Sequence, residues 1–390
     1  MKYREEVINN VVVTASSFTG NAVTEMHMVA RTCSRMPLAQ EIKELCAALS
    51  LHFASSGIPG NAVAFARFFV SDFMNQRSAL KVAGDQFRAA FGPAAVSVVQ
   101  QPPLTAGNKV VLWVYAVVDA DKGGAVTPFP GGGMLRRPGC THLWNTQIVA
   151  KNTDEDAYAQ TTAVFRHWTG LLKQQGGTLA DNAMRSWLFV KDIDYNYHDV
   201  VRARKDFFAA HGMTKDSHFI ASTGIEGRSH DPQVRVLLDG YALLGHQDRQ
   251  VRHLKALSHL NPTYEYGVTF ERGTSIDFGD RRHVLISGTA SIDARGEILH
   301  PMNVGRQMER AMENISALLA DAEAGLGDIA QMIVYLRDLA DRELIQDYCT
   351  EKLPQVPKVL VLAPVCRPGW LVEVECIAIR SKDNPALAPF

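Results

Sequence analysis

Two carboxylates lie on one face of a strand-forming stretch near the end of the chain. From Leu371 to Ala378 apolar and acidic residues alternate, so Glu373 and Glu375 point to the same side of the predicted strand. Such a face is either solvated, which is ordinary for carboxylates, or enclosed. Enclosure would raise the pKa of a carboxyl group and suit it to deliver a proton near pH 7. The alternation therefore marks a candidate acid, and the rest of the chain must decide between the two alternatives.

The elements that would position this acid occur three times along the chain. A β-rich run that closes on an aspartate spans 65–72, 184–192 and 332–338. Each run follows an amphipathic helix and precedes a second helix and two further strands. The apolar residues of the first helices are Ile42, Leu45, Leu49 and Phe53; Tyr158, Phe165, Trp168 and Leu172; and Met308, Met312, Ile315 and Leu319. This order predicts an α+β fold: three mixed sheets, each with helices on one face, around a pseudo-threefold axis.

Comparison of the three repeats distinguishes Glu373 from Glu375. Aligning the closing strands on Ala116, Ala242 and Ala378 places Val111 and Leu237 opposite Glu373. A solvated face gives no reason for one repeat of three to carry an acid, so this favours a functional Glu373. Asp239 takes the position of Glu375. An acid at the same position in two repeats suits a structural role for both residues.

Composition restricts the class of partner. The 40 basic and 41 acidic residues leave a net charge of -1, which argues against a broad nucleic-acid or membrane surface. The six cysteines form no C-x-x-C pair and the first residues do not resemble a secretory signal, so we expect a reducing, cytoplasmic location. Because no metal or nucleotide motif is present, we expect an activity that needs no cofactor.

The third repeat resembles the YjgF/RidA superfamily of trimeric enamine and imine hydrolases. The resemblance rests on four stretches: 285–290, the helix 306–320, 334–338 and 372–378. It implies RidA/chorismate-mutase-like units. We expect a degenerate RidA-like unit over 1–120, a linker or loop over 121–139, a second unit over 140–245, a connector over 246–262, and over 263–390 the unit that carries the candidate site.

Within the superfamily the chain is most similar to the chorismatases, which cleave the enolpyruvyl ether of chorismate and release pyruvate. The similarity rests on Tyr266-Gly267 before Phe270-Glu271-Arg272, on the Ser-Gly-Thr-Ala-Ser-Ile stretch from residue 287, and on Cys366-Arg367 before Leu371-Val372-Glu373-Val374-Glu375. It implies that Glu373 protonates the vinyl carbon. Cys366 beside this acid, together with Gly288, resembles the branch that forms 3-hydroxybenzoate, although a small buried thiol is the ordinary role of a free cysteine.

A dianionic substrate also needs cations, preferably arginines. Arg272 is the candidate clamp for a carboxylate, with Tyr264 or Tyr266 as a hydrogen-bond donor. Arg204 and Arg337 are further candidates, although surface ion pairs would explain either equally well. Lys358 follows Pro357 where the simple deaminases of the superfamily carry an arginine, which counts against a plain imine deaminase.

Three readings stay open at this point. The chain is a chorismatase-like lyase or hydrolase that forms a hydroxybenzoate or a dihydroxy-cyclohexadiene carboxylate; or it is an enamine or imine hydrolase for another small carboxylate; or it is a non-catalytic ligand-binding or RNA-acting protein. The near-neutral charge argues against RNA. We expect a small anionic substrate, and either a monomer that is an internal pseudo-trimer or a homo-oligomer.

Overall fold

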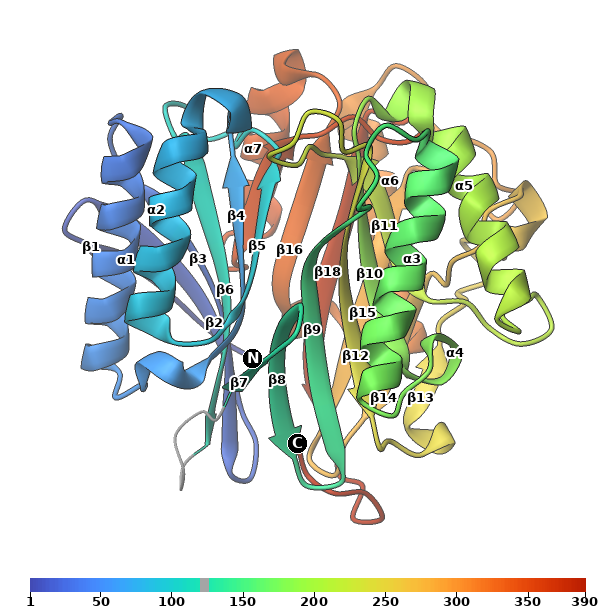
Figure 1. Cartoon of the computed structure of the whole chain (residues 1–390), viewed down its shortest axis with the longest axis horizontal. Coiled ribbons are helices and arrows are strands. Elements are labelled where there is room, and N and C mark those ends of the chain that lie inside the picture. Colours follow the sequence, from blue (N-terminus) through green and yellow to red (C-terminus); the bar gives the residue numbers. More distant parts are fainter. Residues whose placement is uncertain (120–125) are drawn as a thin grey trace.

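The computed structural model describes residues 1–119 and 126–390 and contains three six-stranded sheets. Helices of the first and second units lie on opposite outer sides, and the sheets lie between them (Figure 1). None of the helices in the described part is long and apolar enough to cross a membrane.

Each sheet is built from one unit. The first unit consists of β1 (Lys2–Ile8), β2 (Val11–Thr19), β3 (Val23–Thr32), α1 (Leu38–Ser55), β4 (Val63–Val70), α2 (Phe73–Phe91), β5 (Ala95–Gln100) and β6 (Val110–Asp119). The second consists of β7 (Val126–Phe129), β8 (Gly132–Arg137), β9 (Cys140–Val149), α3 (Ala157–Gln174), α4 (Leu179–Asn182), β10 (Ala183–Val190), α5 (Ile193–Ala210), β11 (Ala221–Glu226) and β12 (Val236–Leu244). The third consists of β13 (Val251–His253), β14 (Gly273–Asp277), β15 (Arg281–Ala290), α6 (Val304–Asp321), β16 (Ile329–Leu336), α7 (Arg342–Lys352), β17 (Lys358–Leu362) and β18 (Val372–Ser381).

The three sheets share one topology. Their strand orders are β1-β2-β3-β6-β4-β5, β7-β8-β9-β12-β10-β11 and β13-β14-β15-β18-β16-β17. In each sheet the last-named pair is parallel and the other pairs are antiparallel. The predicted α+β fold of three similar units is therefore confirmed.

The sheet register supports the alignment of the closing strands. Ala116, Ala242 and Ala378 each pair with the first residue of the neighbouring central strand: Val63, Ala183 and Ile329. Further along, Val111 pairs with Phe69, Leu237 with Phe189 and Glu373 with Tyr335. Glu373 thus occupies a position that is apolar in both other units.

The helices pack as their apolar spacing predicts, with one exception. The predicted apolar residues of α1 and α6, and Phe165, Trp168 and Leu172 of α3, are all buried. Tyr158 is the exception: it is only partly buried, and its hydroxyl donates a hydrogen bond to Asp206 at 2.8 Å. The aspartate after the central strand begins the next helix in two units, since Asp72 accepts from the N–H of Asn75 and Asp338 from that of Ala340.

Two segments predicted as connections contribute strands instead. Of the predicted linker over 121–139, residues 120–125 lie outside the described part, whereas β7 and β8 form a hairpin that extends the second sheet. Glycine signals a loop, but at Gly132 a side chain would clash: its Cβ would lie 1.7 Å from the carbonyl oxygen of Trp144. In the predicted connector over 246–262, β13 pairs with β14 at the edge of the third sheet.

Buried ion pairs join the three units in a cycle. Arg67 meets Asp239 at 2.8 Å between the first and second units, and Arg185 meets Glu375 at 2.7 Å between the second and third. Arg281 meets Glu25 at 2.7 Å between the third and first units. All six side chains are almost fully buried. Removing one partner of such a pair typically costs about 3–5 kcal/mol, so these pairs oppose any separation of the units.

Candidate active site

A cleft between the second and third units contains most of the predicted site residues. The second unit contributes side chains from α5 and β11, and the third contributes side chains from β15, β18 and residues 365–370. The cleft encloses about 500 Å³ of space without protein atoms, part of it open to solvent. Both walls come from a single chain, so the site is complete without a partner subunit.

Glu373 lies in this cleft and is 5% exposed, which overturns the solvated-face alternative. Burial, and next the charge of Glu375, raise the pKa of its carboxyl group to about 8, while Arg185 and Arg272 act in the opposite direction. Among the described residues, its carboxyl group has no hydrogen-bond or ion-pair partner in the protein. A carboxyl group in this state is neutral at pH 7 and has a proton to give.

Glu375 is held in a different environment on the same strand. Its carboxylate accepts hydrogen bonds from Arg185 and from the indole N–H of Trp187, each at 2.7 Å, and from the hydroxyl of Thr223. The three donors all belong to the second unit. Glu375 therefore fastens β18 to the second unit, and its fixed negative charge helps to keep the proton on Glu373.

Gly288 gives the Glu373 carboxyl group its space. A Cβ atom at this position would lie 2.1 Å from Oε1 of Glu373 and 3.1 Å from Cγ2 of Thr223. The Gly288 N–H donates to the Thr223 hydroxyl at 2.9 Å, which fixes the backbone at this point of β15. Any larger residue at 288 would displace the acid, so the absent side chain is part of the site.

Arg204 is the clearest anion-binding group of the cleft. It lies on α5 and is 1% exposed, yet its Nε and Nη2 atoms have no hydrogen-bond partner among the residues that the structure describes. Its guanidinium carbon lies 5.8 Å from the centre of the Phe270 ring. The surface ion pair considered from sequence is absent, and a buried guanidinium without an anion is suited to receive one from a ligand.

Arg272 lines the same cleft, with its guanidinium carbon 5.6 Å from the centre of the Phe270 ring. Its Nε and Nη2 atoms donate to the backbone carbonyl of Asn261 at 3.2 and 3.0 Å, and Nη2 also donates to the Asn261 side-chain oxygen at 3.2 Å. These bonds hold the guanidinium near Glu373, whose pKa it lowers.

Cys366 lies beside the acid, on the segment between β17 and β18, and is partly buried. Burial, and next the charge of Glu373, raise the pKa of its thiol to about 12, and a hydrogen bond with Tyr197 offsets part of this shift. The thiol is therefore neutral at physiological pH. A neutral thiol is a weak nucleophile, so Cys366 is better suited to shape the cleft than to attack a substrate.

Two predicted residues, Arg337 and Tyr264, do not line the cleft. Arg337 forms an ion pair with Asp194 at 2.8 Å and donates to the carbonyl of Val365, so it joins the third unit to α5. Tyr264 is 46% exposed and lines a neighbouring surface cavity, which also contacts Phe270 and Arg272. The side chain of Tyr266, at the end of the short helix Thr263–Tyr266, lies outside the described part of the structure.

Several residues that were not predicted also line the cleft, among them Tyr197, Arg367 and Trp370. Tyr197 lies seven residues before Arg204 on α5, and this two-turn spacing could have placed both on one helical face. Arg367 and Trp370 belong to the turn that carries Cys366, and the guanidinium carbon of Arg367 lies 4.9 Å from the Trp370 ring centre. The indole nitrogen of Trp370 is buried and has no hydrogen-bond partner among the described residues.

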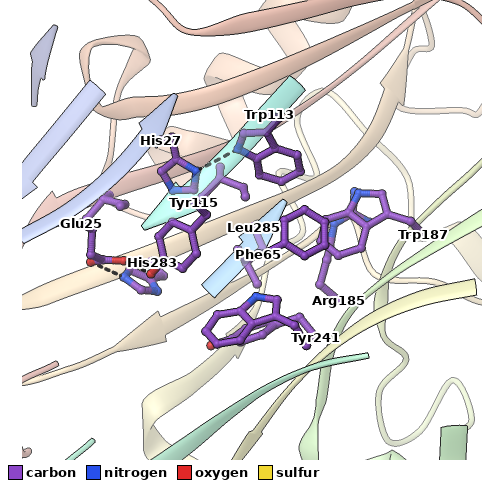
Figure 2. A pocket seen from close by; sticks show the side chains of 13 residues that line it. Glu25, His27, Phe65, Trp113, Tyr115, Arg185, Trp187, Tyr241, His283 and Leu285 are labelled. Carbon is purple, nitrogen blue, oxygen red and sulfur yellow. Dashed lines mark hydrogen bonds and ion pairs between the residues drawn. The ribbon is translucent and has the colours of Figure 1, made fainter. Parts of the chain in front are cut away.

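A second cavity lies between the three sheets: the first and second units line it with aromatic side chains, including Trp113, Trp187 and Tyr241, and the third unit lines it with His283 and Leu285 (Figure 2). In this cavity Glu25 accepts from His283 at 2.9 Å, and the Trp113 indole donates to His27 at 3.3 Å. Burial lowers the pKa of His27 to about 3, so its ring is neutral. None of the sequence-predicted site residues lines this cavity, and its charged groups are paired within the protein.

Within residues 1–119 and 126–390, no three side chains of histidine, cysteine, aspartate or glutamate are grouped so that they could hold a metal ion.

The family is identified from the third unit. The family model described as Endoribonuclease L-PSP matches residues 276–380. A RutC family protein of Pyrococcus abyssi (strain GE5 / Orsay) is 33% identical over 102 residues, which are 25% of this chain and 78% of that protein. The chain belongs to the RutC family. This confirms the resemblance to the YjgF/RidA superfamily.

Other relatives match the same share of this RutC-family chain. The RutC family protein UK114 of Drosophila melanogaster is 31% identical over 107 residues, 25% of this chain and 72% of that protein. The 3-aminoacrylate deaminase RutC of Acinetobacter baylyi (strain ATCC 33305 / BD413 / ADP1) is 26% identical over 97 residues, 24% of this chain and 77% of that protein. Relatives of this length correspond to about one unit of the three.

A solved structure extends the likeness beyond the third unit. The crystal structure of a chorismatase superposes with a TM-score of 0.61 and covers 82% of this chain and 93% of that one. At 17% sequence identity this match shows a shared fold, including the assembly of several RutC-like units within one chain.

Proposed function

We propose that this RutC-family protein cleaves the enolpyruvyl ether of chorismate, or of a closely similar dianion, and releases pyruvate without a cofactor. The observation that carries the proposal is that one cleft contains both an enclosed acid, Glu373, and an enclosed cation, Arg204. Among the described residues, neither the Glu373 carboxyl group nor the Nε and Nη2 atoms of Arg204 have a partner. Cleavage of a vinyl ether in an anionic substrate needs both groups in one cleft. The chorismatase likeness of the fold and of the Cys366–Glu375 stretch adds support.

In the proposed reaction Glu373 transfers its proton to the terminal CH2 carbon of the enolpyruvyl group. This forms a methyl group and leaves an oxocarbenium ion at the ether carbon. A water molecule or a substrate oxygen adds to that carbon, and its proton returns to the Glu373 carboxylate. The water adduct collapses by breaking the bond between this carbon and the ether oxygen, which takes up a proton, and it yields pyruvate and a dihydroxy-cyclohexadiene carboxylate. The adduct of a substrate hydroxyl is a cyclic ketal. It collapses by breaking its bond to the ether oxygen and the ring carbon–oxygen bond of that hydroxyl, so that the hydroxyl oxygen leaves in pyruvate. The ring then loses the proton on the carbon that bears the ether oxygen, this oxygen is protonated, and the product is a hydroxybenzoate.

The two guanidinium groups near Phe270, those of Arg204 and Arg272, suit the two carboxylates of such a substrate. Arg204 has free donors within the cleft, so we assign it the primary carboxylate contact. Arg272 keeps its bonds to Asn261 and contributes its charge to the second carboxylate. Removing a charged partner typically costs about 2–5 kcal/mol when the other partner stays buried.

Cys366 and Gly288 are assigned to the choice of product. The thiol of Cys366 is neutral and lines the cleft beside Glu373, so it contributes shape and a weak hydrogen bond instead of a covalent bond. Gly288 holds the acid in its place. Both features match the expected 3-hydroxybenzoate-forming branch, and replacing Cys366 with alanine should change the product ratio more than the rate.

The relative named 3-aminoacrylate deaminase supports a second candidate function. An enamine carbon accepts a proton from the same kind of acid, so Glu373 could serve a deaminase equally well. Lys358, which replaces the arginine expected in simple deaminases, donates to the backbone carbonyls of Leu353, Pro354 and Val356 and does not line the cleft. The substrate grip of a plain deaminase is therefore missing from this site.

The test is to incubate the purified protein with chorismate and to follow pyruvate with a coupled lactate dehydrogenase assay, identifying the aromatic products by chromatography. The proposal expects one pyruvate for each chorismate consumed. A parallel incubation with an enamine such as 3-aminoacrylate monitors ammonia. Ammonia without pyruvate would favour the deaminase reading, and neither product would favour a ligand-binding protein.

A further inference from the structure

A second opening lies between the third and first units, and it is built from the same elements as the cleft. One wall comes from α7 and β17, which correspond to α5 and β11, and the other from β1–β3 and β6. We call it the third–first groove. It encloses about 1410 Å³ of space without protein atoms, much of it open to solvent.

The sheet register places the linings of the two sites in correspondence. Lys358 pairs with Met332 as Ser222 pairs with Ser186, and Val359 pairs with Ile333 as Thr223 pairs with Trp187. Val111 takes the position of Glu373. The groove therefore carries valines where the cleft carries its acid and the threonine that anchors Glu375.

Two cations converge on this groove. Arg31 on β3 lines it, and no hydrogen bond or ion pair of its side chain is present in the part of the chain that the structure describes. Lys358 lines it as well, with its ammonium group on the carbonyls of Leu353, Pro354 and Val356 at 2.8 to 3.4 Å. Burial lowers the pKa of Lys358, the charge of Glu5 acts in the opposite direction, and the positive charge of Arg31 adds to the lowering, so the two cations repel each other.

At the interface between the first and second units, Gln147 reaches across instead: its amide nitrogen donates to the carbonyl of Val98 at 3.0 Å, and its backbone N–H donates to Asp239 at 2.9 Å.

We propose that the third–first groove binds a small organic carboxylate without transforming it. The carboxylate would meet the Arg31 guanidinium beside the Lys358 ammonium, and the apolar body would rest on Val29, Val111 and Val359. Since Val111 replaces the acid, the groove has no proton donor equivalent to Glu373. This goes beyond the proposed function and does not depend on chorismate being the substrate of the cleft.

Two acidic residues also line the groove and set the expected strength of binding. Glu5, which accepts from the Thr14 hydroxyl at 3.0 Å, and Asp347 both carry negative charge toward it. Binding should therefore be weak, in the millimolar range typical of one exposed charged contact. Removing the charge of Glu5 should tighten it, because a repulsion of the ligand disappears.

The test uses benzoate as the probe and the Arg204→Gln protein as the background, so that binding in the cleft is weakened. Titration followed by ligand-observed NMR should show one saturable site. Adding Arg31→Gln should weaken it by about tenfold or more, and Glu5→Gln should strengthen it several-fold. Arg77→Gln on the exposed face of α2 is the matched control and should have no effect, and the uncharged benzamide should bind at least about tenfold more weakly than benzoate.

The proposal is overturned if the Arg204→Gln protein shows no saturable benzoate binding, or if Arg31→Gln binds benzoate as tightly as the control. A loss of all binding on Arg204→Gln would leave the proposed role of the cleft intact and remove only the groove. Benzoate binding that depends on Arg31 but not on Arg204 would support the groove as a binding site and would count against Arg204 as the anion-binding group of the cleft.

Discussion

The cleft between the second and third units and the third–first groove start from the same backbone and differ in a few side chains. In the cleft, Glu373, Thr223 and Gly288 build an enclosed acid, and Arg204 supplies a cation without a protein partner. In the groove, Val111 and Val359 take the positions of Glu373 and Thr223, and Arg31 and Lys358 supply the cations.

The difference shows how three copies of one unit can provide two sites with different proposed roles: catalysis in the cleft and binding alone in the groove. The strand register that places Glu373 beside Gly288 places Val111 in the groove, so the scaffold tolerates either a carboxyl or a methyl group at this position. Enclosure of the carboxyl group is costly because it raises the pKa, and only the cleft contains the glycine and the anchored neighbour that make room for it.

Removing the cation of the cleft should have the largest effect on binding. Arg204→Gln deletes the guanidinium but keeps an amide, so the affinity for chorismate should fall by a factor of about 30 to 10³. Because Arg204 is buried without a partner, the variant should be at least as stable as the wild type. Arg337→Gln is the control, since Arg337 already has Asp194 as its partner. Isothermal titration and thermal unfolding measure both effects, and equal affinity in the Arg204 and Arg337 variants would exclude Arg204 from the site.

Filling the space beside the acid is the next test. Gly288→Ala puts a methyl group 2.1 Å from the resting position of Glu373 Oε1, so the carboxyl group must move. A displacement of this size typically costs about 10² in rate, and turnover should fall accordingly while the fold survives. Gly170→Ala on α3, which meets nothing within 4 Å, should leave turnover unchanged. A Gly288→Ala protein with normal turnover would mean that the position of Glu373 is not critical.

The pH dependence of turnover should report the proton on Glu373. Its pKa of about 8 means that the acid is protonated at neutral pH and loses its proton above pH 8. Turnover should therefore be flat below this value and fall about tenfold for each further pH unit. The measurement is a rate profile from pH 6 to 10 under saturating substrate. A rate that rises through pH 8 would indicate that Glu373 acts as a base.

The same carboxyl group should lower stability at high pH. Its folded-state pKa is raised above the unfolded value of 4.5, so its favourable contribution is complete below pH 4.5 and is lost as pH rises through about 8. Glu373→Gln removes this dependence and should be more stable than the wild type by on the order of 2 kcal/mol at pH 8. Urea unfolding at pH 5 and pH 8 measures the difference. If the difference between the two proteins is the same at both pH values, Glu373 does not carry the raised pKa.

Sequence patterns were enough to find the acid and the fold, because both depend on local periodicity and on repetition. Glu373 stood out as the one acid among three aligned positions, and the sheet register bears out that alignment. The state of Arg204 could not be found in this way, since burial without a counter-ion depends on residues from another unit. The hairpin of β7 and β8 was missed because glycine marks loops as well as close strand contacts. The roles of Glu373, Arg204, Cys366 and Arg272 stay predictions.

The most direct measurement is pyruvate release from chorismate by the wild type and by Glu373→Gln at pH 7. The variant keeps the shape and hydrogen-bonding capacity of the side chain but has no proton to transfer. We expect a fall in turnover of about 10²–10⁴, with chorismate affinity retained in a parallel titration. If Glu373→Gln releases pyruvate at the rate of the wild type, the assignment of Glu373 as the acid that protonates the vinyl carbon is wrong.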